Sequence, residues 1–236
     1  MRTLFVWFDL GLTLADNNHC ELYQEALIEN HMTGERYNIE KIKRAYHLTN
    51  KYFMRAKPGE LGKRGWNPAE FLNVMLDYLG VVSSDSPEGS TKRKSILDSI
   101  AKRRGRIRWK AFPFSKRVLE ELHEMGIETG LISNWDTTCR GILRETGFLP
   151  HLNPVVISCE VGFQKPDQRI FETALNKAGK EARDCLYVGD NYYDDIVGAS
   201  KVGMRSLLIN PKNRLGIEEI SYPYVIESIK EVKEYV

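Results

Sequence analysis

The chain has 236 residues, of which 42% are hydrophobic and 28% are charged, with a formal net charge of +2. This composition is ordinary for a globular soluble protein, and no apolar run approaches the roughly 20 residues that a membrane-spanning helix needs. The four cysteines are scattered without a CxxC pair. We therefore expect a cytoplasmic protein with reduced thiols, without structural zinc and without a membrane partner.

Short apolar runs predict the strands of a parallel sheet. The first run comprises residues 3–8, and later runs lie at 127–132, 155–157, 185–188, 206–209 and, more weakly, 224–226. Continuous apolar runs of strand length are expected where both faces of a sheet are covered. Amphipathic helical patterns lie between them, including one that Asp167 can cap and Gly179 can end. This alternation predicts an α/β fold with a Rossmann-like, doubly wound parallel sheet.

Between the first strand and the others lies a region with helical patterns and no convincing strand. Apolar residues repeat at helical spacing from Ile39 to Phe53, and Asn67 and Gly80 are a predicted N-cap and a predicted stop for a further helix. Loops are predicted at residues 57–59 and 83–90. We predict a core of residues 1–15 and 112–236, with residues 16–111 inserted as a helical cap.

Polar residues follow the predicted strands. Asp9 follows the first strand, Ser133 and Asn134 follow the next, Asp190 follows the fourth, and Lys165 lies in a loop before a helix. Open parallel sheets bind ligands at the carboxyl ends of their strands, so we expect these groups to meet. A carboxylate can attack a phosphoryl group, and Mg²⁺ with a lysine would keep neighbouring carboxylates ionised. Taken singly, each residue also fits a turn, a cap or a solvated surface.

Four motifs together resemble the haloacid dehalogenase superfamily, specifically its phosphatase-like members with a helical cap. The motifs are FDLGLTL around Asp9 and Thr13, LISN at Ser133, KPDxxIF from Lys165, and VGDxxxxDxxGA from Val188 to Ala199. The resemblance implies Asp9 as nucleophile and Mg²⁺ ligand. It further implies metal ligation by Asp190 and the Gly11 carbonyl, substrate binding by Ser133, Asn134 and Lys165, and a catalytic role for Asp195 behind the metal ligands.

One position departs from the phosphatase pattern. These phosphatases carry a second aspartate two residues after the nucleophile as general acid and base, and Gly11 stands there. General acid–base catalysis contributes about 10²- to 10⁴-fold, and its loss weighs most on alkyl phosphates, whose leaving alkoxide needs a proton. Asp16, His19, Tyr192 or a cap residue could replace it.

Other interpretations of Gly11 remain open. The protein could be a dehalogenase-type or phosphonatase-type member, the latter requiring a cap lysine such as Lys41, Lys43 or Lys51. It could also be a catalytically impaired or non-enzymatic protein that binds phosphate or a partner. We favour a Mg²⁺-dependent phosphatase acting on a small phosphorylated metabolite, and the sequence leaves the oligomeric state open.

A basic stretch extends from Lys92 to Lys110. It contains nine lysines and arginines and one acid, Asp98. It could attract a multiply charged substrate or contact nucleic acid, or it could be a solvated helix face. We favour the solvated face and do not expect nucleic acid as a partner.

Overall fold

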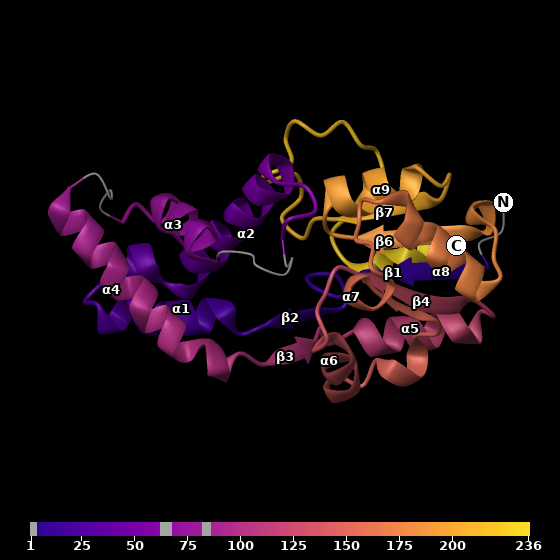
Figure 1. Ribbon diagram of the computed structural model, residues 1–236, viewed down its shortest axis with the longest axis horizontal. Coiled ribbons are helices and arrows are strands. Elements are labelled where there is room, and N and C mark those ends of the chain that lie inside the picture. The colour runs from indigo at the N-terminus through magenta and orange to yellow at the C-terminus, as the bar shows by residue number, and fades with distance from the viewer. Residues whose placement is uncertain (1–3, 62–67, 82–85) are drawn as a thin grey trace. The chain divides into compact units, whose positions relative to one another are not determined.

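The computed structural model describes residues 4–61, 68–81 and 86–236, which divide into two compact units (Figure 1). The sheet unit contains residues 4–16, 54–61 and 109–236, and the helical unit contains residues 17–53, 68–81 and 86–108. The sequence prediction placed all of 16–111 in the insertion, whereas the segment beginning at Met54 groups with the sheet. The predicted N-cap residue Asn67 lies outside the described residues.

The sheet unit is built on six parallel strands in the order β5-β4-β1-β6-β7-β8. Their bounds are β1 Phe5–Phe8, β4 Glu128–Ser133, β5 Val155–Ile157, β6 Cys185–Gly189, β7 Arg205–Ile209 and β8 Val225–Ile226. The predicted doubly wound α/β fold is confirmed. Strand order reverses between β1 and β6, and at such a switch point open α/β sheets bind their ligands.

Alternate residues of β1 contribute to two hydrophobic cores. Val6 and Phe8 pack in a cluster with residues of α5 (Ser115–Glu124), while Phe5 and Trp7 pack with α8 (Gln168–Ala178) and α9 (Val197–Ser200). Figure 1 shows α5 and α9 on opposite sides of the sheet. Because successive side chains of a strand point to opposite faces, a strand covered on both sides must be apolar throughout.

The sheet unit also contains several short helical segments. They are α6 Cys139–Glu145, α7 Ser158–Val161, the π-helical turn η5 Tyr192–Ile196, and the 3₁₀ turns η3 Leu149–His151, η4 Ala182–Asp184 and η6 Ile229–Glu234. The predicted ends of α8 are confirmed. The Asp167 carboxylate accepts the backbone N–H of Arg169, and Gly179 ends the helix in the left-handed region.

The helical unit packs four helices around its own core. These are α1 His19–Glu29, most of α2 Ile39–Ala56, α3 Pro68–Tyr78 and α4 Pro87–Arg103, with 3₁₀ turns η1 Glu35–Tyr37 and η2 Arg104–Arg106. The core includes Leu27, Ile42, Met75, Leu76 and Ile96. No described helix is long and apolar enough to cross a membrane.

Two predictions for the insertion are wrong in part. The predicted loop at 83–90 is helical from Pro87, because the Ser86 hydroxyl caps the backbone N–H of Gly89 and proline occupies the first helical position. The region also contains strand residues at its two ends. There β2 (Ala15–Asn17) pairs with β3 (Trp109–Ala111) in a two-stranded sheet, and such short strands carry no alternating pattern that sequence could reveal.

Candidate active site

The fold brings the predicted polar residues to one edge of the sheet. Asp9 directly follows β1, Asp190 directly follows β6, and Ser133 is the last residue of β4. Asp195 lies in the η5 turn, and Lys165 lies in the loop between α7 and α8. Since β1 and β6 are the strands that flank the switch point, the carboxylates of Asp9 and Asp190 lie where an α/β sheet binds its ligand.

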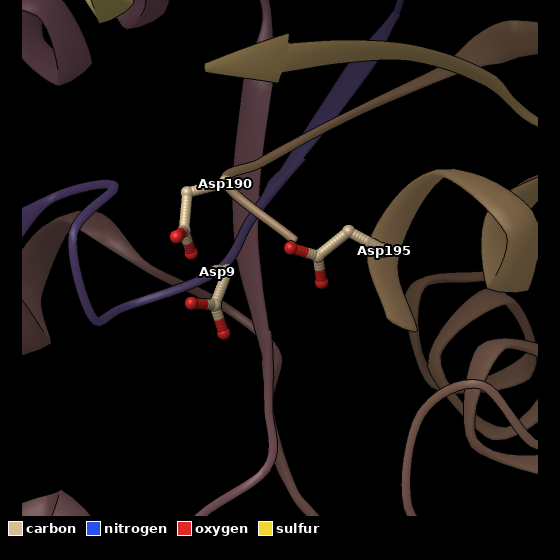
Figure 2. Close-up of side chains that lie close together, drawn as sticks. All are labelled: Asp9, Asp190 and Asp195. Atoms are coloured by element: carbon tan, nitrogen blue, oxygen red, sulfur yellow. The ribbon is translucent and has the colours of Figure 1, made fainter. Parts of the chain in front are cut away.

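Three carboxylates form a compact cluster at this edge. One oxygen from each of Asp9, Asp190 and Asp195 lies within 4.8 Å of the other two. Figure 2 shows the carboxyl groups of Asp190 and Asp195 directed towards Asp9. All three residues are buried, and Asp195 is 0% exposed. Buried like charges at this separation repel strongly, so the cluster requires positive charge or protons.

Lys165 supplies positive charge. Its Nζ donates to Asp9 Oδ1 at 2.8 Å and to Asp195 Oδ1 at 2.6 Å, and the residue is 3% exposed. The Ser133 hydroxyl donates to the same Asp9 oxygen at 2.9 Å. The other oxygen, Asp9 Oδ2, accepts no hydrogen bond from the described residues. One oxygen of Asp9 is therefore fixed by two donors, and the other is available to a ligand.

The pKa values follow from burial and from these neighbours. Burial raises the pKa of Asp9; the positive charge of Lys165 opposes this effect and the charge of Asp195 adds to it. Burial alone would lower the pKa of Lys165, but the charges of Asp195 and Asp9 outweigh burial and raise it well above its usual value. Lys165 therefore stays protonated at neutral pH. A further positive charge nearby would lower the pKa of Asp9 and favour its ionised form.

Asp195 is fixed on both oxygens. Its Oδ1 accepts from Lys165 and lies 3.0 Å from the Tyr187 hydroxyl, and its Oδ2 accepts the backbone N–H of Asn191 at 3.0 Å. A Cβ atom at position 189 would collide with this carboxylate, which explains glycine before Asp190. Asp195 therefore fixes the Lys165 ammonium and the Asn191 backbone, whereas Asp9 keeps one oxygen available to a ligand.

Asn134 contacts the backbone of Lys165. Its amide nitrogen donates to the Lys165 carbonyl at 2.9 Å, and its amide oxygen accepts the Lys165 N–H at 2.7 Å. These paired hydrogen bonds fix the lysine loop against the end of β4. In this arrangement Asn134 orients Lys165.

The sequence motifs assign no role to Asp194, which directly precedes Asp195 and is also buried. Its carboxylate accepts the backbone N–H of Gly59 at 2.8 Å and the Asn191 side-chain amide at 2.9 Å, while Gln164 donates to the Gly59 carbonyl at 2.6 Å. Burial, reinforced by Asp195, raises the pKa of Asp194 to about 7. The turn containing Gly59 is thus attached to the loops that carry Lys165 and Asp195.

Sequence reasoning missed Tyr187. This tyrosine lies within the apolar run of β6 and is 0% exposed, yet its hydroxyl lies 3.0 Å from Lys165 Nζ, Asp195 Oδ1 and the Ile132 carbonyl. A buried tyrosine hydroxyl needs a hydrogen-bond partner. A tyrosine in a strand predicted to be buried therefore indicates a hydrogen bond, but the sequence does not identify its partner.

Two tryptophans surround Gly11. A Cβ atom at Gly11 would lie 3.3 Å from Trp135 Cζ3 and 3.7 Å from Trp109 Cη2. The two indoles meet edge to face with centroids 4.8 Å apart, and the Trp135 Nε1 donates to Thr138. A Cβ atom at position 11 would therefore require the Trp135 ring to shift by a few tenths of an ångström.

The residues suggested as replacements for the missing acid lie in different environments. Asp16 is exposed on β2, and the Tyr192 ring packs against Tyr193 and Tyr222. His19 belongs to the helical unit, where burial lowers its pKa to about 4. Neither Asp16 nor Tyr192 makes a described hydrogen bond to Asp9, and His19 is uncharged at neutral pH.

Several members of the basic stretch have partners within the helical unit. Arg93 is buried and donates to Asp77 and to the carbonyls of Asn73 and Val81. Arg103 pairs with Glu25 and Glu29, and Arg106 also pairs with Glu25. All three arginines therefore make contacts within the helical unit, as expected for a structural role.

The chain belongs to the haloacid dehalogenase-like hydrolases, because that family's model matches residues 6–209. A relative from Danio rerio, haloacid dehalogenase-like hydrolase domain-containing protein 3, is 25% identical over 210 residues, which cover 86% of this chain and 84% of that protein. A glyceraldehyde 3-phosphate phosphatase from Methanothermobacter thermautotrophicus is 34% identical over 134 residues. That match covers 52% of this chain and 57% of the phosphatase.

A solved structure supports the fold assignment. The HAD-hydrolase YfnB from Bacillus subtilis, bound to magnesium, aligns over 100% of this chain and 99% of its own with a TM-score of 0.60. Its sequence identity is 18%, so the likeness concerns the fold.

Proposed function

We propose that this protein is a Mg²⁺-dependent phosphatase that hydrolyses a small phosphorylated metabolite through an aspartyl-phosphate on Asp9. The observation that carries the proposal is the Asp9 carboxylate itself. It lies at the switch point with Oδ1 held by Lys165 and Ser133, and its Oδ2 accepts no hydrogen bond from the described residues. Family membership and the named phosphatase activity of the archaeal relative support the same reaction class.

The donor set fits a magnesium ion. Mg²⁺ prefers carboxylate and carbonyl oxygens, and three buried carboxylates lie together here with one ammonium. Asp9 and Asp190 would hold the ion with the Gly11 carbonyl, while Asp195, fixed by Lys165 and Asn191, would support them. When bound, the ion would offset the carboxylate charge and stabilise negative charge on the phosphoryl oxygens.

The proposed chemistry has two steps. The Asp9 carboxylate attacks phosphorus, the new O–P bond forms, and the bond to the leaving-group oxygen breaks. Water then attacks the aspartyl-phosphate and releases inorganic phosphate with the Asp9 carboxylate restored. Ser133 and Lys165 hold the Asp9 carboxylate in one orientation through Oδ1, which reduces the entropic cost of aligning it with phosphorus.

The glycine at position 11 shapes the expected substrate range. A side-chain acid at this position is absent, and Trp135 and Trp109 surround the space where one would begin. A leaving group that departs without receiving a proton is favoured under these conditions. We therefore propose that acyl and aryl phosphates are hydrolysed faster than alkyl phosphates.

The test compares wild-type protein and Asp9→Asn on p-nitrophenyl phosphate, acetyl phosphate and a panel of phosphorylated metabolites. We expect Mg²⁺-dependent turnover by the wild type and a loss on the order of 10⁴-fold or more in Asp9→Asn, because removal of a nucleophile eliminates the covalent route. Equal turnover by Asp9→Asn would exclude Asp9 as nucleophile, and mass spectrometry of rapidly quenched wild type should detect the phosphorylated aspartate.

A further inference from the structure

The Lys165 ammonium has three N–H groups, and the structure accounts for all three. Their acceptors are Asp9 Oδ1 at 2.8 Å, Asp195 Oδ1 at 2.6 Å and the Tyr187 hydroxyl at 3.0 Å. An ammonium offers three donors and no acceptor. In this arrangement no N–H of Lys165 remains for a phosphate oxygen.

The Tyr187 hydroxyl is itself fixed by the sheet. Tyr187 pairs with Trp7 of β1 in the parallel register, and its hydroxyl lies 3.0 Å from the carbonyl of Ile132 on β4. The side chain therefore reaches from β6 to the strand on the far side of β1, one residue before Ser133. Its ring packs edge to face against Phe171 of α8 at 5.4 Å.

We propose that Tyr187 is a positioning residue, whose hydroxyl accepts the third N–H of Lys165 and thereby directs the other two at Asp9 and Asp195. The proposal rests on the proposed function, because it concerns how the Asp9 carboxylate is oriented for attack. The hydroxyl proton remains for the Ile132 carbonyl or for Asp195, which ties the ammonium to the strand that ends in Ser133.

The variant Tyr187→Phe distinguishes a positioning role from a role in packing alone. Tyr187→Phe keeps the ring and its contact with Phe171 but removes the third acceptor of the ammonium. Lys165 would then turn towards another acceptor, and Asp9 Oδ1 would lose a defined donor. We expect kcat on p-nitrophenyl phosphate with Mg²⁺ to fall about 10- to 100-fold, the usual effect of removing a group that supports a metal-binding carboxylate. KM should change little, because the hydroxyl acts through Lys165.

The matched control is Tyr222→Phe in the same unit. The Tyr222 hydroxyl donates to the Ser206 carbonyl at 2.7 Å, so this variant also loses a hydroxyl hydrogen bond to the backbone. We expect a similar decrease in Tm for both variants and wild-type kcat for Tyr222→Phe. Wild-type kcat in Tyr187→Phe, or a raised KM with unchanged kcat, would overturn the proposal.

A second measurement is independent of turnover. In protein labelled with ¹⁵N-lysine, the buried Lys165 ammonium should give a slowly exchanging signal, assigned by its absence in Lys165→Arg. Tyr187→Phe should shift or broaden that signal, and Tyr222→Phe should leave it unchanged. If the wild type hydrolyses none of the phosphates, the proposed function fails and this signal decides the positioning role. An unchanged signal in Tyr187→Phe would then overturn it.

Discussion

The sheet unit and the helical unit differ in how their buried charged side chains are balanced. The sheet unit buries four carboxylates, Asp9, Asp190, Asp194 and Asp195, with one ammonium, Lys165. In the helical unit the buried Arg93 has a carboxylate and two carbonyls as acceptors, and Arg103 has two glutamates. An excess of buried charge is unfavourable unless a ligand balances it, so it marks a binding site better than a conspicuous basic stretch does.

The largest expected effect comes from removing divalent metal. EDTA should abolish hydrolysis of p-nitrophenyl phosphate and lower the Tm of the sheet unit, because the clustered carboxylates then repel. Mg²⁺ at 100 times its Kd should stabilise the protein by about 2.7 kcal/mol. Asp190→Asn should lose this Tm response, and Asp98→Asn, an exposed position in the helical unit, should keep it. Full activity in EDTA would contradict the proposed compensation of charge.

A smaller effect, on stability, should follow from removing the buried Arg93 guanidinium of the helical unit. Arg93→Met leaves the carbonyls of Asn73 and Val81 without this donor and should cost about 3 kcal/mol. Lys94→Met, at an exposed position that makes no hydrogen bond or ion pair with the described residues, should change stability by less than about 0.5 kcal/mol. Hydrogen exchange of the α3 and α4 amides can measure both local free energies. Equal effects of the two variants would mean that the Arg93 contacts are unimportant.

The smallest effect concerns His19. Burial lowers the pKa of its imidazole from 6.5 to about 4, and the ring stacks on Tyr23. The unfolded chain therefore binds a proton at His19 at higher pH than the folded chain does. The stability that depends on a neutral His19 is present above pH 6.5 and is lost as the pH falls towards 4. Between pH 7 and pH 5 the helical unit should lose about 2 kcal/mol through His19.

The matched variant is His19→Phe, which keeps an aromatic ring beside Tyr23. Hydrogen exchange of α1 peptides at pH 7 and pH 5 should show the decrease in the wild type and a smaller decrease in this variant. Identical pH dependence would show that His19 titrates normally and is more exposed to water than the structure indicates.

Much of the sheet, and the meeting of the main residues of the candidate site, could be predicted from sequence. The strand that ends at Asp9 and the one that ends at Gly189 are continuous apolar runs, and burial on both faces demands that pattern. Asp9, Ser133 and Asp190 lie at strand ends, and parallel strands bring such ends to one edge. The predictions at β2, β3 and residues 87–90 failed because short strands and a serine-capped helix start lack a hydrophobic period.

Sequence alone therefore determined the family, the α/β sheet and the positions of Asp9, Ser133, Lys165 and Asp190. Only the tertiary structure decided how these groups are paired. The hydrogen bond of Tyr187 to Lys165 spans 22 residues, and Trp109 and Trp135 reach Gly11 from distant parts of the chain. Local patterns report which side chains are buried, whereas the partner of a buried polar atom depends on which distant segments fold against it.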